Sequence, residues 1–189
     1  MKRGLFFKSY LILVPLMSCG NFSQTIEKDI VSDSESIEVI KQDEIPKIKF
    51  DIFETLNGWL RRGVEQKTII DSLGIPDNKG DDEYWGSTGT YVQEWKYKAL
   101  GLILYMESDE FEGNKTVFII EVVSPSSYKT SKGVGIGATM DFVLKKHANE
   151  INEEASDQDV IIIGSIYEGT YFFIKEGKVN NFIIGALAD

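Results

Sequence analysis

The fold of this 189-residue chain is decided by YVQEWKYKALGLILYME, residues Tyr91 to Glu107. Two runs rich in aromatic and aliphatic residues, Tyr91–Tyr97 and Gly101–Glu107, are separated only by the short segment Lys98–Leu100. Apolar runs of this length joined by a short connection are typical of neighbouring antiparallel strands. A third run, Thr116–Val123, follows them along the chain. We therefore predict three consecutive strands.

A helix is predicted before these strands, and the same order recurs later in the chain. Glu65–Leu73 places Ile69 and Ile70 on one helical face, and Gly74 follows as a helix stop. The second series is a helix at Thr139–His147 and strands at Asp159–Ile166, Gly169–Lys175 and Lys178–Gly185. We therefore expect an α+β domain in which two helix-plus-three-strand repeats, at about 58–123 and 132–186, share an antiparallel sheet.

Two short motifs in the first repeat carry a family resemblance. The helix is followed by LGIP (Leu73–Pro76), and the first strand contains WKY (Trp95–Tyr97). This pattern resembles the repeat of the small outer-membrane lipoproteins that accompany the barrel-assembly machinery, and of the β-lactamase-inhibitor-protein-like domains, which contain two such units. The resemblance implies a protein that presents a surface to another protein and is not a catalyst. This chain departs from the pattern in an insertion-like loop at Asp77–Thr90 and in lacking the inhibitors' disulfides.

The amino terminus predicts a signal peptide and a lipid anchor. In residues 1–18, basic residues precede a short apolar run, which is the pattern of a secretory signal peptide. The next residue, Cys19, is the only cysteine. With Leu16, Met17 and Ser18 before it and Gly20 after it, Cys19 resembles the modified cysteine of a bacterial lipobox. An acylated mature chain is held at a membrane. Because no aspartate follows the cysteine, we expect the outer membrane of a diderm bacterium, with the domain in the periplasm or facing outward.

The remaining chain is predicted to contain a tether and one domain. Residues 19–46 are polar and acidic without a sustained hydrophobic period, which favours a flexible tether, and 47–189 are long enough for one core. Loss of the three basic residues of the signal peptide would change the formal charge from −10 to −13. Such a charge disfavours nucleic acid as a partner.

No pattern in the chain predicts a catalytic residue, a metal site or a cofactor. Gly133–Gly137 lacks the spacing and the preceding strand of a dinucleotide-binding turn. Ser126–Lys129 fits S-x-x-K but lies in a segment that favours an irregular connection. The carboxylates of Asp77–Glu83 do not follow an EF-hand pattern, and a solvated turn is expected there. His147 is the only histidine, and we expect it to pack at the edge of a helix's apolar face.

An aromatic segment, Glu83–Tyr91, is the strongest candidate for a binding loop. Tyr84, Trp85 and Tyr91 alternate there with small polar residues, a composition that suits protein or sugar contacts. The alternative is that Trp85 covers the end of the sheet. The function expected is that of a non-catalytic envelope lipoprotein that binds a protein or an envelope polymer. Two alternatives are a small hydrolase using Ser126, Lys129 or His147, and a glycan-binding module using exposed rings of Tyr84, Trp85 and Trp95.

Overall fold

The computed structural model describes residues 54–186. The chain divides into two units, Met1–Ile45 and Pro46–Asp189, and all described residues belong to the second. Their elements, in chain order, are α1 (Gln66–Leu73), β1 (Asn78–Trp85), β2 (Thr90–Tyr97), the 3₁₀ turn η1 (Lys98–Leu100), β3 (Leu102–Ser108), β4 (Thr116–Val122), α2 (Met140–Lys146), β5 (Val160–Gly164), β6 (Gly169–Lys175) and β7 (Lys178–Gly185).

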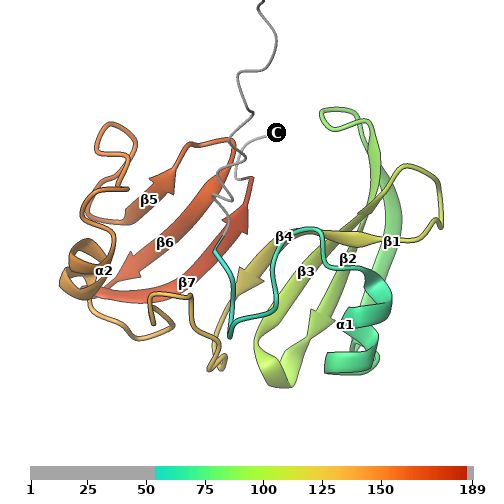
Figure 1. Ribbon diagram of the computed structural model, residues 1–189, viewed down its shortest axis with the longest axis horizontal. Coiled ribbons are helices and arrows are strands. Elements are labelled where there is room, and N and C mark those ends of the chain that lie inside the picture. The colour runs from blue at the N-terminus through green and yellow to red at the C-terminus, as the bar shows by residue number, and fades with distance from the viewer. Residues whose placement is uncertain (1–53, 187–189) are drawn as a thin grey trace, which may run out of the picture. The chain divides into compact units, whose positions relative to one another are not determined.

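The seven strands form one sheet in the order β1-β2-β3-β4-β7-β6-β5. Every neighbouring pair is antiparallel. Two meanders, β1–β4 and β5–β7, are joined where β4 pairs with β7 through Ile120 opposite Ile184 and Val122 opposite Phe182. Figure 1 shows α1 beside the β1–β3 end of this sheet and α2 beside the β5–β6 end.

The main core lies between the sheet and the two helices. Alternate residues of β3 face it, so Leu102, Leu104 and Met106 are fully buried while their neighbours are partly exposed. Ile69 of α1 and Val143 of α2 are the buried residues of the two helices, and both belong to this cluster. The helices are short, so most of the core comes from the strands.

The tight connection between β2 and β3 depends on glycine. Gly101 ends the η1 turn with a φ of 58°, in the left-handed region that other residues disfavour. A Cβ atom at this position would lie 2.2 Å from the carbonyl oxygen of Val123. Only glycine fits this close approach between backbone segments, which lets the two central strands follow one another directly.

The predicted α+β fold of two helix-plus-three-strand repeats is wrong. The described residues form a β-rich fold, in which one seven-stranded antiparallel sheet carries only two short α-helices. The physical reason is that Asn78–Trp85 adds a fourth strand to the first series, while the two helices are only eight and seven residues long, so strands dominate the domain. Several local predictions agree with the structure, since β6 and β7 have the expected bounds and α1 begins one residue later than expected.

The predicted loop at Asp77–Thr90 is also wrong, and so is the solvated turn expected at Asp77–Glu83. Asn78–Trp85 forms the edge strand β1, which pairs with β2 from Asn78 opposite Lys96 to Trp85 opposite Thr90. A register shift between Lys79 and Asp82 marks a bulge in this strand. Edge strands tolerate charged residues and bulges, so the polar composition that suggested a loop is compatible with a strand here.

The predicted signal peptide (1–18), the whole predicted tether (19–46) and the lipobox lie outside the described residues. Within residues 54–186, no helix is long and apolar enough to cross a membrane.

Candidate functional site

A second apolar cluster covers the face of the sheet opposite the main core, which we call the outer face. Val92 of β2 and Phe118 and Ile119 of β4 are buried there, and half-buried Trp85, Tyr105 and Ile183 pack against them. Phe118 and Ile119 can share this face because a register shift between Tyr105 and Met106 interrupts the alternation of β4. No residue of α1 or α2 belongs to this cluster.

The outer face is hollowed into a groove of about 470 Å³, within the size range of ligand pockets. Its walls come from the β1–β2 hairpin, from β3, β4 and β7, and from the turn between β5 and β6. We call it the aromatic groove; its lining residues are Trp85, Ser87, Thr88, Tyr105, Phe118, Ile119, Glu121, Tyr167, Ile183 and Ala186.

A smaller cavity of about 230 Å³ adjoins the aromatic groove, because both are lined by Trp85 and Tyr105. Its remaining lining residues are Gly80, Asp81, Glu83, Val92 and Glu94. We call it the acidic cavity. The two hollows therefore form a continuous surface that is aromatic at one end and acidic at the other.

Three rings of the aromatic groove, those of Trp85, Tyr105 and Phe118, contact one another. Trp85 lies 6.1 Å from Tyr105 and 6.2 Å from Phe118 between ring centroids, the second pair in an edge-on arrangement. The guanidinium carbon of Arg62 lies 4.7 Å from the centroid of Phe118, and Arg62 Nη1 donates to Glu168 Oε1 at 3.1 Å. Rings fixed in this way offer contact area at a low entropic cost.

Negative charge perturbs the titratable groups of the groove. Burial raises the pKa of the Glu121 carboxyl, and the charge of Glu94 raises it further, while a hydrogen bond with Asn181 and the charge of Lys96 oppose the shift. Burial, followed by the charges of Glu121 and Glu94, also raises the pKa of the Tyr105 hydroxyl. Glu94 itself pairs with Lys96 Nζ at 2.7 Å.

The three aromatic residues of the predicted binding loop do not form one cluster. Tyr84 and Tyr91 pair edge-on at 5.3 Å, and Tyr91 continues to Phe111 at 5.6 Å. Trp85 instead lies in the outer-face cluster and lines both hollows. The expected loop is shorter than predicted, because only residues 86–89 separate β1, which holds Tyr84 and Trp85, from β2, which holds Tyr91. Tyr84 and Trp85 lie on different faces because successive strand residues point to opposite faces. Tyr84 is 60% exposed.

Sequence reasoning missed most of the groove. Tyr105, Phe118 and Glu121 were treated as ordinary strand residues, and Tyr167 lies in a turn that carried no motif. One signal was present, because β4 contains a continuous apolar run, Val117–Ile120, where a sheet with one solvated face would alternate. Such a run indicates that both faces of the strand are covered or functional.

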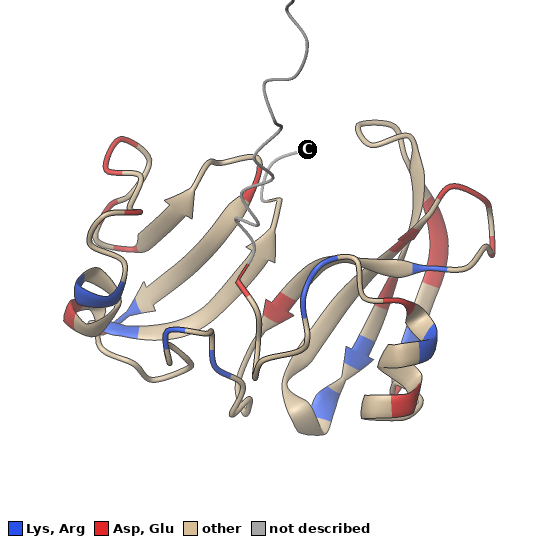
Figure 2. Ribbon diagram, viewed as in Figure 1, with Lys and Arg blue, Asp and Glu red and all other residues tan. Residues whose placement is uncertain are grey.

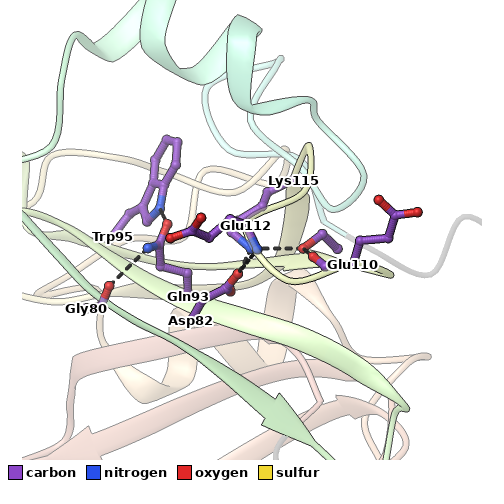
Figure 3. Close-up of polar contacts among 8 residues, drawn as sticks. Gly80, Asp82, Gln93, Trp95, Glu110, Glu112 and Lys115 are labelled. Atoms are coloured by element: carbon purple, nitrogen blue, oxygen red, sulfur yellow. Dashed lines mark hydrogen bonds and ion pairs between the residues drawn. The ribbon is translucent and has the colours of Figure 1, made fainter.

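A buried ion pair fixes the hairpin that forms one wall of the groove. Lys115 Nζ lies 2.6 Å from Asp82 Oδ1, and both side chains are only 4% exposed. Asp82 Oδ2 also accepts the backbone N–H of Glu112 at 2.6 Å, and Lys115 donates to Ser108 Oγ at 2.9 Å. Figure 3 shows this cluster beside Gln93, whose amide bridges the Gly80 carbonyl and the Trp95 indole N–H.

His147 packs as the sequence predicts. Its side chain is 1% exposed and stacks at 5.6 Å from Phe172. The ring atom Nδ1 lies 3.0 Å from Glu150 Oε2, and Glu150 also pairs with Lys132. Hydrogen bonds from Lys132 and then from His147 lower the pKa of the Glu150 carboxyl.

The geometry bears on the two alternative functions. A hydrolase would need Ser126, Lys129 or His147 in a cavity with a carboxylate, and none of the three lines the aromatic groove or the acidic cavity. Ser126 and Lys129 lie in an irregular connection, as predicted. A glycan platform of Tyr84, Trp85 and Trp95 does not exist, because Trp95 is 1% exposed and packs in the main core.

The predicted absence of a metal site concerns the whole chain, and the structure addresses part of it. Among residues 54–186, no group of three or more His, Cys, Asp or Glu side chains is placed to hold a metal ion. Cys19 and its lipobox neighbours Leu16, Met17, Ser18 and Gly20 lie outside this part.

Comparisons with protein-family models, with curated proteins and with solved structures find no match.

Proposed function

We propose that this protein is a lipid-anchored envelope protein that binds another protein through the aromatic groove. The observation that carries the proposal is the groove itself, an apolar hollow of about 470 Å³ with four aromatic residues on a face that neither helix covers. Apolar patches with fixed aromatic side chains are the usual centres of protein interfaces. Non-catalytic action through a surface is also what the family resemblance implies, and that resemblance stays a prediction.

The anchor completes the proposal from sequence. Acylation at Cys19 would hold the protein at a membrane, where the outer membrane of a diderm bacterium is expected, and the domain would meet its partner at high local concentration. The anchor and the partner are separate parts of the proposal and are tested separately.

Site-directed photocrosslinking tests the partner. Tyr167, which lines the groove and is 66% exposed, is replaced by a benzoylphenylalanine in the full-length protein in its native host. Tyr84, exposed to a similar extent but lining neither hollow, is the matched control. We expect one discrete protein adduct from position 167 and none of that mass from position 84.

A second variant establishes that the adduct depends on the groove. Ser87 is an exposed groove residue, and Ser87→Trp fills the hollow without removing a core contact. This substitution should abolish the adduct from position 167. Identical adducts from both tyrosines, or an adduct that persists in Ser87→Trp, would contradict binding through the groove.

A further inference from the structure

The two hollows of the outer face are lined by four carboxylates and by no lysine or arginine. Glu121 lies in the aromatic groove, and Asp81, Glu83 and Glu94 line the acidic cavity beside it. Figure 2 shows acidic segments on β1 and near the end of β4, whereas basic segments are scattered over α1, α2 and the strand ends. Lys96 pairs with Glu94 and also acts on Glu121, and Arg62 beside Phe118 pairs with Glu168, so the lining carboxylates outnumber the cations near them. The surface that a partner would contact is therefore negative.

The rings of the groove already accept one cation. The Arg62 guanidinium stacks on Phe118 at 4.7 Å, an arrangement in which the negative face of the ring attracts the positive group. Trp85, Tyr105 and Tyr167 line the same groove. A second Lys or Arg side chain entering between these rings would meet the same attraction and would have Glu121 within the same hollow.

Glu121 lines the groove in surroundings that disfavour its charge. Burial and the charge of Glu94 raise its pKa, and the hydrogen bond with Asn181 and the charge of Lys96 offset this only in part. A neutral side chain of the same size would avoid this cost. Charged groups held in unfavourable surroundings inside a cavity are frequently functional, because a ligand of opposite charge removes the penalty.

Three occupants of the groove can be compared by charge: the predicted tether of this chain, a second copy of the chain, and a segment of a different protein. The predicted tether, residues 20–46, contains seven acidic residues and two basic ones, so it would be repelled by the carboxylates. A second copy of this chain, with a formal charge of −10, is disfavoured for the same reason. A basic segment of a different protein is the occupant that complements both the charge and the rings.

We infer that the outer face recognises a basic segment of its protein partner, which inserts a lysine or arginine side chain between the aromatic rings and Glu121. This inference rests on the proposed function, because it specifies the chemistry of the partner at the same groove. Glu121 is then a specificity-determining residue, and the acidic cavity receives the flanking basic residues of the segment.

Selection from a library of random linear peptides tests the inference on the mature chain, residues 19–189. Selected peptides are synthesised, and their dissociation constants are measured by fluorescence anisotropy with the unmodified protein and three variants. Ser87→Trp reports whether a peptide occupies the groove. Glu121→Gln removes the charge at constant size, and Glu153→Gln removes an exposed charge from the loop after α2 as the matched control.

The expected peptides carry Lys or Arg beside an apolar residue and no longer bind Ser87→Trp. Their dissociation constants should rise about tenfold or more in Glu121→Gln, because one partner of a partly buried charge pair is lost, and should not change in Glu153→Gln. Their affinity should also fall as salt concentration rises.

The contradicting outcomes separate the inference from the proposed function. Groove-binding peptides that lack basic residues, or that bind Glu121→Gln and the unmodified protein equally well, would overturn the basic partner and leave protein binding in place. Selection of no peptide that is sensitive to Ser87→Trp would also overturn the inference. The crosslinks from position 167 decide the proposed function independently.

Discussion

Glu121 makes a testable contribution to the pH dependence of stability. Its pKa is raised in the folded protein by burial and by Glu94, against the opposing effects of Asn181 and Lys96. A carboxyl with a raised folded pKa binds its proton more tightly in the folded state, so the stabilisation is present below the ordinary value of 4.5 and is lost as the pH rises through the folded value. Glu121→Gln should therefore stabilise the domain at neutral pH, by less than about 1 kcal/mol because the half-buried group is screened.

Urea denaturation at a series of pH values measures this effect. The stability difference between Glu121→Gln and the unmodified protein should shrink as the pH falls from neutral through the raised folded pKa towards 4.5, and it should stay constant below 4.5, where the carboxyl is protonated in both states. Glu153→Gln, in an exposed loop, is the control and should show no such trend. A variant that is less stable than the unmodified protein at neutral pH would contradict the explanation.

At the scale of the element, the buried ion pair decides whether the β1–β2 hairpin holds its place. Lys115, the residue before β4, forms this ion pair with Asp82 of β1. Lys115→Met leaves the Asp82 carboxylate buried without its cation, so the free energy of unfolding should fall by about 3–5 kcal/mol. The double variant Asp82→Asn, Lys115→Met should recover part of this loss, because it removes the unpaired charge.

The matched control is an ion pair of similar length at the surface. Lys67 and Asp71 of α1 lie 2.5 Å apart with side chains 80% and 61% exposed, so Lys67→Met should change the denaturation midpoint little. If Lys115→Met shifted the midpoint no further than Lys67→Met, the ion pair would not be what holds the hairpin.

At the scale of the whole molecule, the predicted anchor can be tested separately from the folded domain. Cys19→Ala should move the protein from the membrane to the soluble fraction in its native host, because acyl chains supply the membrane affinity. Mass spectrometry of the mature amino-terminal peptide should show a lipid adduct on Cys19. Purified Cys19→Ala should unfold at the same urea concentration as the anchored form in detergent. A bare thiol at Cys19 in the mature protein would contradict the anchor.

Several elements could be predicted because their signals are local. The apolar runs between glycines and charged turn residues predict β6 and β7, and the apolar face with the stop at Gly74 predicts α1. The spacing of His147 after Met140, Val143 and Leu144 predicts its packing on the apolar side of α2, which it follows as the cap residue. Each signal lies within about ten residues of the element that it predicts, so no knowledge of the fold was needed.

The edge strand β1 shows where local signals fail. Asn78–Trp85 is mostly polar and reads as a loop, yet it forms a strand because β2 offers unpaired backbone groups and because Asp82 finds Lys115. Lys115 is distant in sequence, and β2, although it follows after residues 86–89, pairs with β1 only in the folded sheet. A strand that depends on its neighbour for hydrogen bonds cannot be identified from its own composition.

The sequence by itself determined the helices, most strands, the acidic charge and the lipobox-like motif, since each depends on neighbouring residues. The tertiary structure alone decided that Asn78–Trp85 joins the sheet as its edge strand, that β4 pairs with β7, and that Trp85, Tyr105, Phe118 and Tyr167 line one groove. Those residues come from separate strands and turns. The physical reason is that hydrogen bonding and burial between distant segments set the sheet order, and the sheet order sets which side chains meet.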